Sequence, residues 1–246
     1  MTCALCLVDR KLCDSHIAPD FLYKRMKGSS GDFLAINASK MHALSCKRSF
    51  SEKLLCIECE RKFSQWEGQA KKFLFGEMPL NFSPIKSLKD RVIVNGLPYS
   101  PIKLFFMSVL WRFSLSKNPY LKGSSVGPRH EERLRKLLLT ENPGEPWRYG
   151  CNLTALFIDG SHVPDIIVPP IQLSMYGHET HHLVIAGFLL SFIVASHRPL
   201  KGIVDTAMNE TGRFVLSRAE VIDIPFLATL FAKTVQIPEI KPIGKK

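Results

Sequence analysis

The sequence predicts an α+β protein with a small cysteine-rich N-terminal module and a larger part in which helices precede a mostly antiparallel sheet. Six of the seven cysteines lie within residues 1–76. A proline-containing stretch, residues 77–100, separates them from a helix that is apolar almost all round. From Cys151 onward, short runs of β-branched and aromatic residues are typical of strands. We therefore divide the chain into a module (1–76), a connector (77–100) and an α+β domain of unassigned role (101–246).

Two helices are expected in the module. Pro19 suits the first turn of a short helix that ends before Gly28, because the first turn of a helix leaves its N–H groups unbonded and proline has none. A longer helix is expected from Ile57 to about Phe75, where apolar residues recur every three or four positions. These apolar residues are Phe63, Trp66, Ala70, Phe73 and Leu74. The connector contains one expected short strand, Arg91–Val94.

The larger part begins with helical signals. Ser100 and Pro101 form a cap and a first helical position, and the helix is expected to run to about Leu115. Because its residues are apolar on nearly every face, it should be buried. A second helix is expected at 128–139, with acidic residues early and basic residues late. Expected strands follow at Leu153–Ile158, Ile166–Val168, Leu183–Ala186, Phe188–Ala195 and Arg213–Leu216, before a last helix from Asp223 to about Val235.

Composition narrows the class of protein. Of the 246 residues, 46% are apolar and 22% charged, so the chain can bury a core and is not generally disordered. The longest apolar run, Leu183–Ala195, is shorter than the roughly 20 residues of a membrane span. The N-terminus lacks the pattern of a secretory signal, so a cytoplasmic protein without a membrane partner is expected. The net charge of +11 favours an anionic partner such as nucleic acid, although solubility alone explains the same value.

The cysteines show the most specific pattern. Disulfides are disfavoured in a reducing compartment, whereas Cys3-x-x-Cys6 and Cys56-x-x-Cys59 supply four soft ligands. That is the composition of a closed structural Zn²⁺ site, which has no open position for catalysis. The alternative is four buried free cysteines, which two matched pairs make less expected. The cysteines without paired spacing are expected in the core: Cys13, Cys46 and Cys151.

A second motif lies inside the cysteine frame. The segment Ser15-His16-Ile17-Ala18-Pro19 follows the first pair, and Glu60 directly follows the second. Over residues 1–76 the sequence resembles the HNH (His-Asn-His) endonucleases, which are ββα-metal nucleases with a treble-clef-like structural zinc module. Their pattern is C-x-x-C, Asp-His-Ile-x-Pro, Asn-Leu-x-x-Leu, and C-x-x-C followed by His or Asn. Residues 51–56 match its third piece in spacing.

The resemblance implies a metal-dependent endonuclease that hydrolyses phosphodiester bonds of DNA, with RNA as the second choice of substrate. Family members often serve in bacterial defence against phage. His16 would be the general base, because an imidazole titrates near neutral pH. A Mg²⁺ or Mn²⁺ ion would bind the scissile phosphate. Ser15 and Glu60 stand at the family's ligand positions, and Glu67 shares a helix face with Glu60. Basic residues of the same helix would contact nucleic acid: Arg61, Lys62, Lys71 and Lys72.

Three departures from the family pattern keep an alternative open. Ser15 replaces an aspartate, Ser51 replaces an asparagine, and Glu60 replaces His or Asn. One carboxylate with one hydroxyl is a poorer site for a hard cation than the family norm. The alternative is therefore a zinc module that binds nucleic acid, a protein partner or a second copy without cleavage. His16 would then cap the hairpin by hydrogen bonding, and Glu60 would be a surface acid favoured at a helix N-terminus.

The segment His178-Glu179-Thr180-His181-His182 satisfies H-E-x-x-H, the zinc-peptidase pattern. That chemistry requires both outer histidines one turn apart on a helix. The β-branched and aromatic residues that follow predict a strand instead, where the two histidines would be about 13 Å apart, too far to bind one ion. Glu210, the distant third ligand that a peptidase would need, lies in a turn-like context. We therefore favour a polar strand end over a zinc site.

Overall fold

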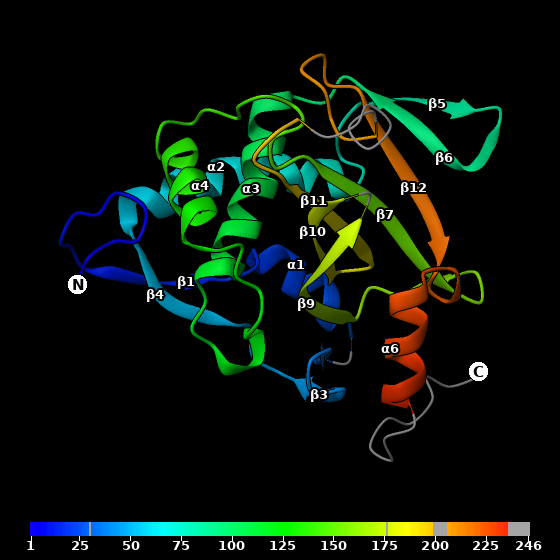
Figure 1. Cartoon of the computed structure of the whole chain (residues 1–246), viewed down its shortest axis with the longest axis horizontal. Coiled ribbons are helices and arrows are strands. Elements are labelled where there is room, and N and C mark those ends of the chain that lie inside the picture. Colours follow the sequence, from blue (N-terminus) through cyan, green and yellow to red (C-terminus); the bar gives the residue numbers. More distant parts are fainter. Residues whose placement is uncertain (30, 176, 199–205, 236–246) are drawn as a thin grey trace.

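The computed structural model describes residues 1–29, 31–175, 177–198 and 206–235. In these residues the protein is a mixed α+β structure with five α-helices, a small two-stranded sheet and a mixed ten-stranded sheet (Figure 1). Two short 3₁₀ turns, Pro119–Leu121 and Val221–Asp223, join larger elements. No helix in the described part of the chain is long and apolar enough to cross a membrane.

The N-terminal unit is a strand pair followed by a helix. β1 (Leu12–His16) pairs antiparallel with β4 (Ser51–Cys56), and α2 (Ile57–Leu74) begins at the next residue. The register sets His16 opposite Ser51 at one end of the pair and Leu12 opposite Cys56 at the other. The expected helix in this region is confirmed, and so is the short helix after Pro19, which is α1 (Asp20–Lys27).

The large sheet has the order β3-β2-β9-β10-β11-β7-β12-β6-β5, with β8 paired to β7. Its strands are β2 (Phe33–Asn37), β3 (His42–Cys46), β5 (Asn81–Ile85), β6 (Leu88–Asn95), β7 (Cys151–Ile158), β8 (Ser161–His162), β9 (Ile166–Met175), β10 (His178–Ile185), β11 (Phe188–Val194) and β12 (Phe214–Glu220). The β2–β9 and β7–β12 pairs are parallel, and the other pairs described are antiparallel.

Strands from all three expected segments share this sheet. β2 and β3 come from residues 1–76 and pair onto β9, while the connector forms the edge hairpin β5–β6 rather than one short strand. The strands expected after Cys151 are all present. Strands from residues 1–76, 77–100 and 101–246 are thus hydrogen-bonded in one sheet. The division of the chain into three segments at residues 76 and 100 stays a prediction.

Helices cover both faces of the sheet. α3 (Tyr99–Leu115) is buried from Ile102 to Ser114, as its apolar faces predict, and packs against α2 and α4 (Pro128–Leu139). Successive strand residues point to opposite faces. Accordingly, Leu183 of β10 belongs to the core beneath α3, whereas Val184 packs with Leu227 of α6 (Pro225–Val235). Figure 1 shows α2, α3 and α4 grouped together and α6 apart from them.

Candidate metal centre and the residues around His16

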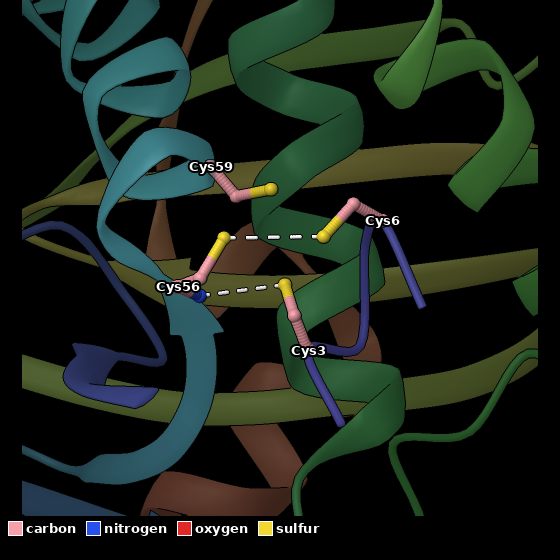
Figure 2. A group of neighbouring side chains, drawn as sticks. All are labelled: Cys3, Cys6, Cys56 and Cys59. Atoms are coloured by element: carbon pink, nitrogen blue, oxygen red, sulfur yellow. Dashed lines mark hydrogen bonds between the residues drawn. The ribbon is translucent and has the colours of Figure 1, made fainter. Parts of the chain in front are cut away.

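The two cysteine pairs meet in one cluster. Cys3 and Cys6 come from the N-terminal turn, Cys56 ends β4, and Cys59 lies in the first turn of α2 (Figure 2). Their four Sγ atoms all lie within 4.8 Å of one another, and those of Cys6 and Cys56 are 3.9 Å apart. A tetrahedral ion with Zn–S bonds of about 2.3 Å requires sulfur atoms about 3.8 Å apart. The cluster therefore fits one structural Zn²⁺, as the spacing predicts.

Backbone amides favour the thiolate form of Cys3, whereas burial raises the pKa of Cys56 and Cys59. The N–H of Cys56 donates to Sγ of Cys3 at 3.3 Å (Figure 2). Burial alone would raise the pKa of Cys3, but hydrogen bonds from the backbone of Cys6, Cys56 and Leu5 bring it down to about 7. Metal binding requires deprotonated cysteines, so these amides favour the metal-binding form. Of the remaining cysteines, Cys46 and Cys151 are buried and Cys13 is partly exposed.

His16 lies at the end of β1 that is away from the cysteines. Its side chain is 39% exposed, and its Nε2 is 3.8 Å from Oδ1 of Asp20 at the start of α1. Asp20 also pairs with Lys24 at 2.7 Å. The strand ladder continues one residue past His16, where the N–H of Ile17 donates to the carbonyl of Phe50. Among the described residues the His16 ring forms no hydrogen bond that would make it a cap of the hairpin.

A buried arginine from α3 connects His16 to α2. Arg112 is 2% exposed, and its Nη1 donates to the backbone carbonyl of His16 at 3.0 Å. Its Nη2 lies 2.9 Å from Oε1 of Glu67, and its guanidinium is 5.3 Å from the Phe63 ring centre. Nε of the same guanidinium donates to the carbonyl of Ser108. Arg112 thus contacts both the backbone of His16 and the carboxylate of Glu67.

The oxygen ligands expected for a catalytic ion are not gathered into a site. Ser15 is buried, and its Oγ accepts a hydrogen bond from the N–H of Leu55 at 3.0 Å. Glu67 is paired with Arg112, and only Glu60 keeps a buried carboxylate oxygen without a partner. Within the described ranges, the cysteine cluster is the only group of three or more residues placed to hold a metal. Ser15, Glu60 and Glu67 therefore do not fit Mg²⁺ or Mn²⁺ as they are arranged.

The basic residues expected to contact nucleic acid differ in their surroundings. Arg61, Lys71 and Lys72 are exposed on α2. Lys62 instead donates to the carbonyl of Leu139 at 2.7 Å and pairs with Glu141 at 3.1 Å. Lys62 therefore binds residues at the C-terminal end of α4. The other three cations of this set are exposed to solvent.

The H-E-x-x-H segment forms β10, and the predicted strand is confirmed. His182 is buried with ring hydrogen bonds to Thr180 and Ser191, and burial lowers its pKa to about 4. His181 points to the opposite face of the sheet and binds Glu179 instead. Glu210 is exposed in the loop before β12. The described residues therefore place no zinc-peptidase site here, which agrees with the polar strand end favoured from the sequence.

Two residues near His16 are not evident from the sequence motif. Asp20 stands four residues after His16, a spacing that is visible only if the intervening Pro19 is read as the start of a helix. Arg112 is separated from His16 by 96 residues, and it belongs to a helix whose apolar pattern gives no sign of a buried cation.

Comparison with family models, curated proteins and solved structures found no significant match to this chain.

Proposed function

We propose that the chain hydrolyses phosphodiester bonds of DNA, with RNA as the less favoured substrate, and that His16 is the general base. The observation that supports this most directly is the position of His16. It is half-exposed at the end of a strand pair that leads straight into α2, and Asp20 lies 3.8 Å from its Nε2. The same unit holds the four-cysteine cluster, as the resemblance to HNH nucleases implies.

In this proposal each residue has a defined part. Nδ1 of His16 takes a proton from the attacking water, and the imidazolium that forms is stabilised by the carboxylate of Asp20 at Nε2. Arg112 positions the backbone of His16 through the 3.0 Å hydrogen bond that it donates to the His16 carbonyl. The exposed cations Arg61 and Lys71 attract the phosphate backbone without reading its sequence.

Zinc has a structural part only. When bound, Zn²⁺ would join the N-terminal turn to β4 and α2, and four thiolates leave it no open position for a substrate. The resemblance also implies a Mg²⁺ or Mn²⁺ ion near His16. Because Ser15 and Glu67 already have protein partners, no step of the reaction is assigned to that ion.

A second candidate function is binding without cleavage. The ion pair between Arg112 and Glu67 supports it, because a buried guanidinium satisfies the carboxylate that a divalent ion would need. The unit would then dock nucleic acid or a protein partner through its exposed cations. Both candidates retain the same fold and the same cysteine cluster, so they differ in the chemistry at His16.

Plasmid cleavage by the zinc-loaded chain, with Mg²⁺ or Mn²⁺ added or chelated, separates the two candidates. We expect His16→Ala to lower the cleavage rate about 10²–10⁴-fold, the usual effect of losing a general base. Asp20→Asn should cause a smaller loss and shift the pH profile. His42→Ala, an exposed histidine on β3, is the matched control and should cleave normally. Cleavage that survives His16→Ala would refute His16 as the general base, and a wild type that binds DNA but never cuts it would favour the binding function.

A further inference from the structure

A polar cluster in the larger part of the chain has no role in the proposed reaction. Nδ1 of His130 on α4 lies 2.9 Å from the hydroxyl of Tyr149, and the two rings meet edge to face. On β10, Nε2 of His181 lies 2.7 Å from Oε1 of Glu179. The carbonyl of Gly150, the residue after Tyr149, accepts a hydrogen bond from the N–H of Ile193 on β11, and Ile193 lies opposite Thr180 of β10, so Tyr149 and the Glu179–His181 pair are two strands apart in one sheet.

Two nitrogen atoms in this cluster lack partners among the described residues. His181 is 0% exposed, and its Nδ1 has no hydrogen bond. Nη1 of Arg133, one turn along α4 from His130, is also buried without a partner. Leaving a buried polar group without a hydrogen bond destabilises the fold, and a charged group more so. In folded proteins such groups usually bond to a water, an ion or a ligand, so the two atoms mark a place where a polar group binds.

The charge of the cluster selects the kind of ligand. Arg129 and Arg133 form no ion pair within the described ranges, because the acids of their own helix are used elsewhere. Glu131 accepts hydrogen bonds from Ser114 and Ser125, and Glu132 pairs with Arg135. Glu179 is the acid beside the cluster, and His181 already uses it. The cluster therefore carries two guanidinium groups against one carboxylate, with one unbonded N–H group on Arg133, which suits an anion.

Access and donor geometry favour a phosphate group. Arg129 is exposed, Arg133 and His130 are half-buried, and the Glu179 side chain is 38% exposed, so the cluster opens to solvent at its rim. A guanidinium offers a planar fork of donors that matches phosphate oxygens. Nε2 of His181 is held by Glu179, which leaves Nδ1 as the ring atom that can meet an O–H of the same ligand. Tyr149 is held in a left-handed backbone conformation at φ 54°, a strain that is common at functional sites.

We propose that α4, the turn containing Tyr149 and β10 form a binding site for a phosphate group, with Arg133 and His181 as its inner ligands and Arg129 at its entrance. The H-E-x-x-H segment thereby contributes its glutamate and middle histidine to an anion site. The site is separate from His16, and the proposal does not depend on the nuclease function.

The test is calorimetric titration of the zinc-loaded full chain in a phosphate-free buffer, first with inorganic phosphate and then with a short DNA duplex. We expect inorganic phosphate to bind the wild type and Arg133→Gln to weaken that binding about tenfold or more, the usual scale for a lost charged contact. Lys136→Gln removes the same charge from an exposed position of the same helix and should bind as the wild type does. His181→Asn should also weaken binding, and Arg133→Gln retains the test if His181→Asn does not fold.

Competition then identifies the source of the phosphate. If inorganic phosphate displaces the duplex, the site holds a phosphate of the nucleic acid backbone; if both bind without competition, it holds a free phosphate ester or ion. Either result supports the site. No binding of inorganic phosphate, or equal weakening by Arg133→Gln and Lys136→Gln, would overturn it. Because His16→Ala leaves this site intact, loss of cleavage with normal phosphate binding would keep the two proposals apart.

Discussion

The four-cysteine cluster and the oxygen ligands expected for a catalytic ion differ in what surrounds them in the fold. All four cysteines lie in the first 59 residues, in two matched pairs, and their sulfur atoms converge. The oxygens of Ser15 and Glu67 are already engaged, the first by Leu55 and the second by Arg112 of α3. A soft-metal site built from local pairs can therefore be predicted from spacing. The availability of a carboxylate depends on a cation that only the tertiary fold brings to it.

The largest loss of stability is expected on mutating a cysteine of the four-cysteine cluster. Cys56→Ser should abolish stoichiometric Zn²⁺ binding and unfold the N-terminal unit. A structural zinc site contributes about 10–16 kcal/mol in small zinc domains, which is as large as the whole stability of most domains. Elemental analysis and a circular-dichroism melt of chain purified without chelator measure both consequences.

Cys13→Ser is the matched control, since Cys13 lies outside the cluster and is only partly buried. It should keep one Zn²⁺ per chain and melt close to the wild type. A Cys56→Ser protein with full zinc content, or a zinc-free wild type with an unchanged melt, would show that the four sulfur atoms meet without holding a metal.

The next largest loss of stability is expected on removing Arg112, the partner of the Glu67 carboxylate. Arg112→Met leaves the Glu67 carboxylate without its partner and removes the donor to the carbonyl of His16. Breaking a buried ion pair on one side costs about 3–5 kcal/mol, and the partial exposure of Glu67 should keep the loss near or below the lower end. Urea denaturation measures it. Adding Glu67→Gln to Arg112→Met should recover part of the stability, because no unpaired charge then remains.

Arg10→Met tests whether burial, rather than the ion pair itself, matters. The pair between Arg10 and Glu58 is exposed on both sides, and such pairs contribute about 0–1 kcal/mol. Equal losses in Arg10→Met and Arg112→Met would contradict the view that α3 supplies a cation on which the His16 region depends.

The fold shows the same division between local and distant information. α2, α3 and α4 follow from the sequence pattern, and their bounds agree with the prediction within about two residues. The expected cap of α3 is wrong, because the helix begins at Tyr99 with Pro98 as its N-cap, which places Ser100 and Pro101 inside the first turn. The hairpin β5–β6 was only partly expected, because β5 is exposed along almost its whole length and carries Pro84 at a sheet edge. The parallel pairing of β2 with β9 joins residues more than 130 positions apart, and no local pattern encodes it.

The candidate site divides in the same way. The spacing of Cys3, Cys6, Cys56 and Cys59 predicts their cluster. The family resemblance implies that His16 is a base, and the structure puts this residue at the end of β1 with Asp20 beside it. Sequence periodicity also puts Glu60 and Glu67 on one face of α2, but it cannot show which of them meets a cation. Glu67 is the one that pairs with a cation, Arg112, and no sequence motif indicates this pairing.

A pH-dependent effect is expected from a second buried basic side chain of α3, Lys103, which lacks the carboxylate partner that Arg112 has. Lys103 is 4% exposed, and its Nζ donates to the hydroxyl of Tyr99 and to the carbonyl of Glu145. Burial lowers the pKa of Lys103 to about 7, although the charges of Glu145 and Glu210 oppose this. In the unfolded chain the lysine has its ordinary pKa of about 10.4.

Between about pH 7 and pH 10 the unfolded chain therefore binds a proton at Lys103 that the folded chain does not, and the free energy of unfolding should rise with pH in that window. The slope for one group is at most about 1.4 kcal/mol per pH unit, and it should vanish below about pH 6, where both states are protonated. Urea denaturation below pH 9 measures this before tyrosines titrate. Lys103→Met should flatten the slope, whereas Lys136→Met, at an exposed site, should not. A slope that survives Lys103→Met would mean that Lys103 stays charged in the fold, held by Tyr99 and the Glu145 carbonyl as firmly as Arg112 is held by Glu67.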